Sequence, residues 1–520
     1  MSHQNGREED LDDMLAADEA AEEIEQGDDI AMDSEEDGDG GGDDDDDDDG
    51  NGGQEELVLH NDSIGYFDEP QDSLFSIAQH PIHSSLVAVG GAAGSDEDAP
   101  GAGFIVDTSS APSRPVLPAS YAADPASASG GSAQGQHQLK SLFSIEGHTD
   151  SINALTWTLP HGEVLVSGGL DGRIRAWRTE VRPGEGVKVS LIGEAEEVPE
   201  VNWLQACPSP ANPNTVALGA SDGSVWVYTI DPTDEANPLQ IVQSYFLHTM
   251  PCTAGCWTPD GQLLATVSED SSLYVWDVWG QAAARGLTAG GDGGTTVVSQ
   301  TGEDQRFEVP GGLYSVAVDP KGGFVAAGGA GGVIKIVSLP RLTPPTQSRS
   351  QARGAQRGNK ASSDSAGGQI LASLQAQSDS VESLAISMTS ASPPTVLLAA
   401  GSVDGSICVY DATRRFAVRR HLVGAHEEHS VVKVEFVRDS WLLTSCGMDG
   451  VVRRWDLRGS AVSGPGASSG AGTDNAGLLK EWRGHRGDGE GGGVLGFVQG
   501  ETGSRIITAG DDSIALVFEA

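Results

Sequence analysis

Basic residues are scarce in this chain. Its 520 residues include 30 Lys and Arg against 77 Asp and Glu, which gives a formal net charge of -47. A field of that sign repels nucleic acid and anionic membrane surfaces, and it attracts basic proteins by steering that salt weakens. We therefore expect no direct contact with nucleic acid or membrane, and a partner that is itself a basic protein.

Cysteines and long apolar runs are also few. The five cysteines, Cys207, Cys252, Cys256, Cys408 and Cys446, lack the paired spacing of a zinc site or a redox motif. No window approaches the roughly 18 apolar residues of a membrane span, and no apolar stretch follows a basic region at the N-terminus. These absences predict a soluble protein without metal or cofactor, in a reducing compartment: the cytoplasm, and the nucleus as well. We also expect a monomer.

Acidic residues are concentrated at the start of the chain. The first 56 residues carry 26 of them and a single base, Arg7, and they include the run Asp43 to Asp49. Such a segment cannot bury enough apolar surface to offset the entropy of ordering. We therefore predict a disordered acidic tail over residues 1–54 and a folded domain over 55–520. That domain is acidic too, because residues 57–520 hold 51 acids and 29 bases.

One unit recurs through the folded domain. Its clearest copy is KSLFSIEGHTDSINALTWTLPHGEVLVSGGLDGRIRAW (Lys140 to Trp177), in which turn residues separate four strand-like runs. In six copies a turn Asp precedes an aromatic by six residues: Asp171 and Trp177, Asp222 and Tyr228, Asp270 and Trp276, Asp404 and Tyr410, Asp449 and Trp455, and Asp512 and Phe518. Two weaker copies, around Gly331 and from Ser73 to Gly91, bring the total to eight.

The order of strands within these units predicts how the domain closes. Outer strands are expected at 56–60, 139–145, 188–192, 240–247, 305–309, 369–374, 416–423 and 478–482. Because the chain ends on a third strand, Ile514 to Phe518, the last unit lacks its outer strand. The segment 56–60 is expected to supply that strand. Such closure removes exposed sheet edges.

The details of the units resemble those of WD-repeat β-propellers. Gly-His corners occur at Gly147-His148 and Gly484-His485, and Trp-Asp pairs end the strands at Trp276-Asp277 and Trp455-Asp456. The resemblance covers residues 55–520. It implies an all-β, closed WD40-type propeller, and the repeat count indicates eight blades.

A recurring set of His, Ser or Thr, and Asp could suggest a hydrolase triad. Its members are His148, Ser167, Asp171 and Trp177, then His248, Thr266, Asp270 and Trp276, then His426, Ser445, Asp449 and Trp455. A catalytic site is needed once, whereas a buried polar network can serve every blade. In WD-repeat proteins the equivalent residues form such a network. Because phosphate loops, zinc-protease motifs and nucleophile elbows are absent as well, we expect no enzyme.

Insertions separate the two faces of the expected propeller. Four low-complexity stretches, 108–138, 280–303, 341–368 and 459–477, each lie between a third strand and the following outer strand, and so share one face. The opposite face keeps short connections. The resemblance to WD-repeat proteins implies that such a rigid face, with its central depression, holds the ligand.

Acids collect in the segments that build this second face. The predicted partner-binding residues are Asp72, Glu146, Asp150, Glu194, Glu196, Glu197, Glu200, Glu269, Asp379, Glu382, Glu427 and Glu428. A single acid can equally serve solubility, but the cluster from Glu194 to Glu200 costs stability unless something offsets it, which favours function. Phe75 and Tyr314, at the start of first strands, are expected either at the rim of the pore as anchors or in the core.

Two segments carry a closer resemblance: DSLFSIAQHPIHSSLVAVGG (Asp72 to Gly91) and LKSLFSIEGHTDSINALTW (Leu139 to Trp157). With the acidic tail, they resemble the angio-associated migratory cell protein family, whose yeast member is a ribosome-assembly chaperone. The resemblance implies a chaperone that binds the basic N-terminal region of a newly made large-subunit ribosomal protein of the L-ten family and delivers it for ribosome assembly. The alternatives are a histone-binding propeller and a general scaffold, such as a ubiquitin-ligase or trafficking adaptor.

Overall fold

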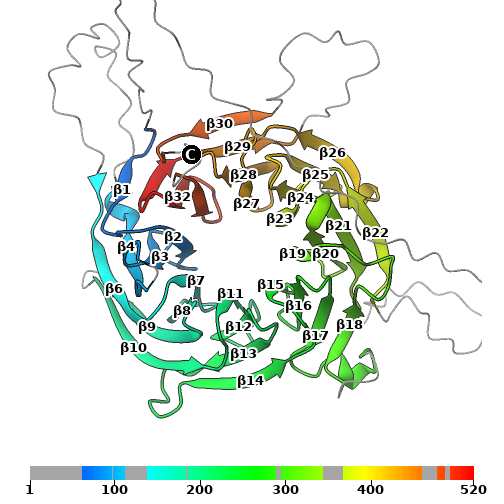
Figure 1. Ribbon diagram of the computed structural model, residues 1–520, viewed down its shortest axis with the longest axis horizontal. Helices are drawn as coiled ribbons and strands as arrows, with labels where there is room; N and C mark the ends of the chain where they lie inside the picture. Colours follow the sequence, from blue (N-terminus) through cyan, green and yellow to red (C-terminus); the bar gives the residue numbers. More distant parts are fainter. Residues whose placement is uncertain are drawn as a thin grey trace, which may run out of the picture. The chain divides into compact units, whose positions relative to one another are not determined.

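The computed structural model describes residues 61–96, 98–111, 137–182, 186–288, 294–342, 367–458, 477–486 and 492–520. In these ranges the strands form eight sheets, which are arranged as the blades of a ring around a central opening (Figure 1). Seven sheets have four strands each, and the eighth has a fifth strand at its outer edge. The predicted eight-bladed propeller is therefore confirmed.

The first four blades follow the chain in order. Blade 1 contains β2 (Leu74–Gln79), β3 (Leu86–Ala92), β4 (Gly101–Asp107) and β6 (Ser141–His148). Blade 2 contains β7 (Ile152–Trp157), β8 (Val164–Gly169), β9 (Arg173–Arg182) and β10 (Gly186–Glu196). Blade 3 contains β11 (Val201–Ala206), β12 (Thr215–Ala220), β13 (Val225–Ile230) and β14 (Leu239–Tyr245). Blade 4 contains β15 (Cys252–Trp257), β16 (Leu263–Ser268), β17 (Leu273–Asp277) and β18 (Thr296–Gln300).

The next four blades complete the ring. Blade 5 contains β19 (Leu313–Val318), β20 (Phe324–Gly329), β21 (Val333–Ser338) and β22 (Ile370–Gln375). Blade 6 contains β23 (Val381–Met388), β24 (Val396–Ser402), β25 (Ile407–Asp411) and β26 (Ala417–Leu422). Blade 7 contains β27 (Val431–Phe436), β28 (Leu442–Gly447), β29 (Val452–Asp456) and β30 (Leu478–Trp482). Blade 8 contains β31 (Val494–Val498), β32 (Arg505–Gly510), β33 (Ala515–Glu519) and β1 (Gly65–Phe67), with β5 (His137–Gln138) parallel to β1.

Helix is confined, in the described ranges, to short 3-10 turns. These are η1 (Thr108–Ser110), η4 (Ala283–Arg285), η5 (Ala330–Gly332) and η7 (Ala412–Arg414). No helix in these ranges is long and apolar enough to cross a membrane.

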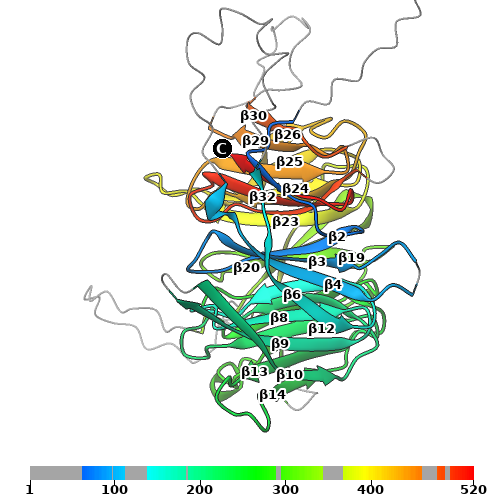
Figure 2. The same cartoon turned by 90° about the vertical axis from the view of Figure 1, so that its left-hand side faces the viewer.

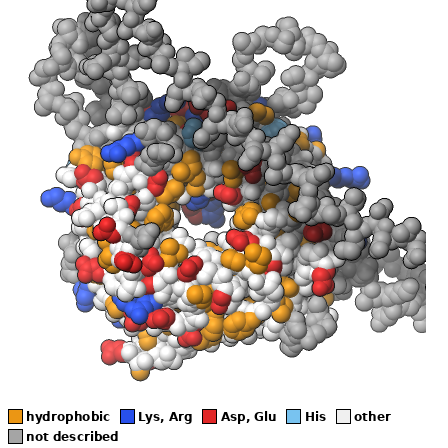
Figure 3. Space-filling view, viewed as in Figure 1, with side chains coloured by type: hydrophobic (Ala, Val, Ile, Leu, Met, Phe, Trp, Pro, Cys, Tyr) orange, Lys and Arg blue, Asp and Glu red, His pale blue; other side chains and the backbone are white. Residues whose placement is uncertain are grey.

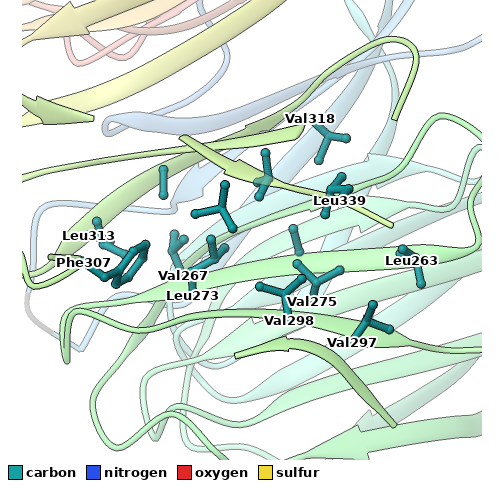
Figure 4. Packing of buried hydrophobic residues seen from close by; sticks show 14 of the residues in the cluster. Leu263, Val267, Leu273, Val275, Val297, Val298, Phe307, Leu313, Val318 and Leu339 are labelled. Atoms are coloured by element: carbon teal, nitrogen blue, oxygen red, sulfur yellow. The ribbon is translucent and has the colours of Figure 1, made fainter. Parts of the chain in front are cut away.

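The core lies between the blades. Figure 4 shows the cluster shared by blades 4 and 5, in which Leu263, Val275 and Val298 pack with Leu313 and Val318. Figure 2, turned so that blade 1 faces the viewer, shows its strands between those of blades 8 and 2. Full burial of each large aliphatic side chain stabilises the fold by roughly 1.5 to 3 kcal/mol. Every blade therefore depends on both neighbours.

The ring closes through an N-terminal strand. β1 pairs antiparallel with β33, Gly65 opposite Val517, and the first strands β2 and β31 lie in contact. The predicted closing segment, residues 56–60, lies outside the described residues, as does the predicted tail. The strand observed beside β33 begins at Gly65.

The predicted outer strand at 305–309 is wrong. The outer strand of blade 4 is β18, with Thr296 opposite Trp276, inside the stretch that had been predicted as an insertion. Its β-branched residues suit a pleated sheet. Residues 305–309 instead follow a turn in which Asp304 accepts the backbone N–H of Arg306 at 3.0 Å, and Phe307 is fully buried between blades 4 and 5.

Candidate functional site: an acidic hollow at the centre of the ring

A β-bulge recurs at the second residue of every first strand. The register shifts at this point in all eight blades. In blade order the residues are Phe75, Asn153, Asn202, Thr253, Tyr314, Glu382, Val432 and Leu495. Bulges commonly re-aim a side chain near a functional site.

Five of these bulge residues line a hollow of about 470 Å³. They are Asn153, Asn202, Thr253, Tyr314 and Glu382, and the remaining lining residues are Glu200, Ser221, Pro251 and Glu269. Glu200, Ser221, Pro251 and Glu269 come from the connections that lead into first strands and from the turns between second and third strands. We call the face built by these segments the corner face. Figure 3 shows Asp and Glu side chains around the central opening.

Polar donors in the hollow are committed to joining the blades. The Asn153 amide donates to the Val201 carbonyl at 3.2 Å, and the Asn202 amide donates to the Cys252 carbonyl at 3.1 Å. The Thr253 hydroxyl donates to the Leu313 carbonyl at 2.7 Å. Each bond runs from one first strand to the next and holds the rim of the hollow in place.

The carboxylates in the hollow are free. Among the described residues, the carboxylates of Glu200, Glu269 and Glu382 make no hydrogen bond or ion pair, and the Tyr314 hydroxyl already donates to the Gly311 carbonyl at 2.6 Å. Burial and the charges of Glu269 and Glu382 raise the pKa of Tyr314. Burial and the nearby Asp379 raise the pKa of Glu382. The hollow is therefore an acceptor site that favours a cationic donor.

The predicted acidic cluster from Glu194 to Glu200 separates into two pairs. Glu194 and Glu196 lie on β10 and form ion pairs with Arg175 at 2.7 Å and Arg173 at 3.0 Å. Glu197 and Glu200 follow the strand and are exposed. The arginines on β9 therefore offset half of the charge that sequence reasoning expected to be unbalanced.

The remaining predicted acids are spread around the corner face. Asp72, Asp150 and Asp379 each accept the backbone N–H of the following serine, at 2.7, 2.6 and 2.7 Å. Glu146, Glu427 and Glu428 are exposed. None of these six lines the hollow. They contribute to the field of the face, whereas Glu200, Glu269 and Glu382 form its centre.

The two aromatic candidates have different positions. Tyr314 lines the hollow. Phe75 occupies the bulge position of blade 1 and is 42% exposed, but it is not among the residues that line the hollow. Neither side chain is a fully buried core residue.

The polar network of blade 2 joins the four predicted residues. His148 Nδ1 lies 3.1 Å from Asp171, and His148 Nε2 lies 2.8 Å from the Ser167 hydroxyl. That hydroxyl accepts the indole N–H of Trp177 at 3.0 Å. Since His148 ends the outer strand of blade 1, the network joins two blades.

Blade 4 reaches its aspartate through an added serine. His248 Nε2 lies 2.8 Å from the Thr266 hydroxyl, which also accepts the Trp276 indole N–H at 2.8 Å. On the other side, His248 Nδ1 contacts the Ser272 hydroxyl at 2.6 Å, and this hydroxyl donates to Asp270.

Blade 7 contains the most highly charged network. His426 lies 2.8 Å from both Asp449 and Ser445, and Trp455 donates to Ser445 at 2.9 Å. Burial opposes ionisation of Asp449, but the bonds from His426 and Arg453 outweigh it and lower its pKa to about 2.

A further network, outside the set predicted from sequence, occurs in blade 8. There His485 contacts Asp512 at 2.9 Å and Thr508 at 2.7 Å. These networks are built into the joints between blades and lie apart from the hollow.

Sequence reasoning missed the polar bulge residues Asn153, Asn202 and Thr253, together with Ser221 and Pro251. The signal was available in part. Each bulge residue follows the first buried residue of its strand, as in Ile152-Asn153 and Val201-Asn202. Aligning all eight units on that position would have placed Asn153, Asn202 and Thr253 beside Tyr314.

Eight blades of four or five strands, with buried His and Asp networks at the joints of blades 2, 4, 7 and 8, define a WD-repeat β-propeller. The family model described as WD domain, G-beta repeat matches residues 139–178, 239–277 and 368–411. The chain is also similar to a crystal structure of Chaetomium thermophilum Sqt1 bound to the N-terminus of the ribosomal protein L10. The identity is 54%, the TM-score is 0.72, and the match covers 89% of this chain and 100% of that one. This chain belongs to the Sqt1 family.

Two curated proteins extend this relationship. The ribosome assembly protein SQT1 of Saccharomyces cerevisiae is 27% identical over 489 residues, covering 89% of this chain and 88% of that protein. The human angio-associated migratory cell protein is 23% identical over 378 residues, covering 72% of this chain and 69% of that protein. The resemblance stated from the sequence is confirmed.

Proposed function

We propose that this protein is a dedicated escort of a newly made large-subunit ribosomal protein, and that its hollow holds the basic N-terminal region of L10 until ribosome assembly. The observation that carries the proposal is the hollow itself, which the carboxylates of Glu200, Glu269 and Glu382 line without an ion pair among the described residues. The Chaetomium thermophilum Sqt1 bound to the N-terminus of L10 supports this choice of client.

The chemistry of the hollow suits Lys, Arg or an amino terminus. Each can donate charge-assisted hydrogen bonds to carboxylates, which are roughly twice as strong as neutral ones. The ring of Tyr314 offers a face for a cation-π contact. The acidic corner face would speed encounter with a basic client through steering that salt weakens. A nascent basic protein held in this way is screened from RNA.

The role we propose is binding without catalysis. The His and Asp pairs that could suggest a reaction are buried at the joints of blades 2, 4, 7 and 8, where they hold one blade to the next. We place the protein in the cytoplasm and also in the nucleus, where its five cysteines would stay reduced, consistent with their being free. A monomer suffices, because one ring contains the whole hollow.

The test is calorimetric titration of the full chain with a peptide of the client's N-terminal region. Glu269→Gln and Glu382→Gln should each weaken binding by about five- to tenfold, since each removes one charge-assisted contact. The matched control is Glu235→Gln, an exposed acid in the connection between β13 and β14. Affinity should also fall as salt rises from about 0.05 to about 0.5 M.

Two results would contradict the proposal. One is equal binding of the peptide by the chain and by both hollow variants. The other is a preference for histone-tail peptides over the ribosomal peptide, which would indicate a histone-binding propeller instead.

A further inference from the structure

Three large apolar side chains lie on or beside the connection between β14 and β15, on the corner face. Phe246 and Met250 lie in the connection between β14 and β15 and are 63% and 46% exposed. Trp226 on β13 is half-buried, and its ring meets that of Phe246 edge-on with centroids 5.7 Å apart. Single exposed apolar residues are ordinary on protein surfaces, whereas a cluster indicates an interaction site. We call Trp226, Phe246 and Met250 the aromatic rim.

The aromatic rim is continuous with the hollow. The turn Ser221 to Ser224 of blade 3 lies between two connections: Ser221 N–H donates to the Glu200 carbonyl at 3.2 Å, and a Cβ on Gly223 would lie 2.7 Å from the Met250 carbonyl. Glu200, Ser221 and Pro251 all line the hollow. A chain leaving the hollow over blade 3 therefore meets Met250 and then Phe246.

Negative charge accompanies the aromatic rings. Trp226 stacks on Tyr228 with centroids 6.5 Å apart. Burial and the charge of Glu197 raise the pKa of Tyr228, so Glu197 contributes negative potential at the Tyr228 hydroxyl. An aromatic face beside a carboxylate suits a cation with an apolar neighbour. The rim therefore complements a segment that carries both basic and apolar side chains.

The size of the rim decides what kind of occupant it can hold. Stable docking of a folded partner buries more than about 1,000 Å², which three side chains cannot supply. A segment already anchored in the hollow needs no such area, because tethering raises its effective concentration to the millimolar range.

We propose that the aromatic rim binds the stretch of client chain that leaves the hollow, and that this stretch carries an aromatic or aliphatic side chain next to a basic one. This inference rests on the proposed function, since its occupant is the continuation of the segment held in the hollow. The aromatic rim then distinguishes between basic clients of similar charge, because it binds only those that carry an apolar residue at this position.

The test compares two peptides in titrations of the full chain. One peptide covers only the N-terminal basic residues of the client, and the other extends about ten residues toward its folded body, roughly 30 Å of extended chain. Phe246→Ser and Met250→Ser are the test variants. Leu479→Ser is the matched control, because Leu479 on β30 is 56% exposed and belongs to blade 7, away from blade 3.

The expected result is that the longer peptide binds more tightly than the shorter one, and that the two rim variants together remove about tenfold of this affinity. Binding of the shorter peptide should stay unchanged, as should every reading with the control. Unchanged binding of the longer peptide, or equal losses for both peptides, overturns the role of the rim alone. Failure of the unmodified chain to bind either peptide overturns the rim and the proposed function together.

Discussion

Replacing Asp449 with Asn tests whether the network of blade 7 stabilises the ring. The Asp449 side chain is 7% exposed. It accepts a bond from Arg453, itself 7% exposed, and one from His426 at 2.8 Å. The substitution leaves Arg453 with one carboxylate partner, Glu481 at 2.9 Å, and with its contact to His426 Nδ1 at 2.9 Å. The buried guanidinium at the joint between blades 6 and 7 therefore loses one of its two carboxylate partners.

Two estimates give the decrease in the free energy of unfolding that Asp449→Asn should cause. A pKa lowered from 3.8 to about 2 corresponds to about 2.4 kcal/mol of stability, at 1.36 kcal/mol per unit. Removing one member of a buried ion pair costs roughly 3 to 5 kcal/mol. We expect a decrease of about 2 to 4 kcal/mol in the free energy of unfolding.

Urea unfolding followed by tryptophan fluorescence measures this decrease. Asp222→Asn in blade 3 is the matched control, because Asp222 occupies the equivalent turn but bonds only to Ser224. The control should cost about 1 kcal/mol. Equal losses for the two variants would refute the reasoning.

The pH dependence gives an independent check. The pKa of Asp449 is lower in the folded state than in the unfolded state, so its contribution is complete above pH 3.8 and is lost as pH falls through about 2. The difference between the unmodified chain and the variant should shrink to roughly 1 kcal/mol near pH 3. A difference that stays constant from pH 7 to pH 3 would show that the carboxylate charge contributes nothing.

Two further predictions concern the corner face. Asn202→Ala removes the hydrogen bond to the Cys252 carbonyl, so it should lower the free energy of unfolding in urea by about 1 kcal/mol and weaken client binding severalfold. Unchanged client binding would show that this hydrogen bond is not needed to hold the edge of the hollow in place. Gly223→Ala adds a Cβ 2.7 Å from the Met250 carbonyl at a φ of +83°, and should destabilise the chain more than Gly186→Ala, where φ is +90° and no atom lies within 4 Å. Equal unfolding midpoints for the two glycine variants would contradict the steric argument.

The repeat pattern was enough to predict the fold, because in six of the units a turn Asp and an aromatic residue six positions later mark where the third strand begins and ends. The outer strand of blade 4 was missed since the run Thr296–Gln300 follows a glycine-rich stretch, and Phe307 looks like a strand residue although it fills the joint between blades. Outer strands pair on one edge only, so their sequence is weakly constrained. Middle strands such as β16 are fully buried and were located correctly.

The acidic residues of the corner face could be identified from the sequence, but whether each carboxylate forms an ion pair could not. Whether Glu194 or Glu200 is free depends on a partner on another strand, and only the register of β10 against β9 brings Glu194 opposite Arg175. The same holds for Asn153 and Asn202, whose acceptors belong to the next blade. Sequence spacing within one unit contains no information about such bonds.

Ring closure and ligand preference depend on the same side chains. Asn153, Asn202 and Thr253 use donors to join consecutive first strands, and that use removes from the hollow most of the groups that could have bound an anion. What is left to a ligand is mainly three carboxylates and a tyrosine ring, with the Ser221 hydroxyl beside them. A substitution that frees one of these donors therefore changes two properties at once: it loosens a joint of the ring, and it makes the hollow less selective for a cation. Stability and specificity should fall together for such variants, whereas changes to Glu269 or Glu382 should alter specificity alone.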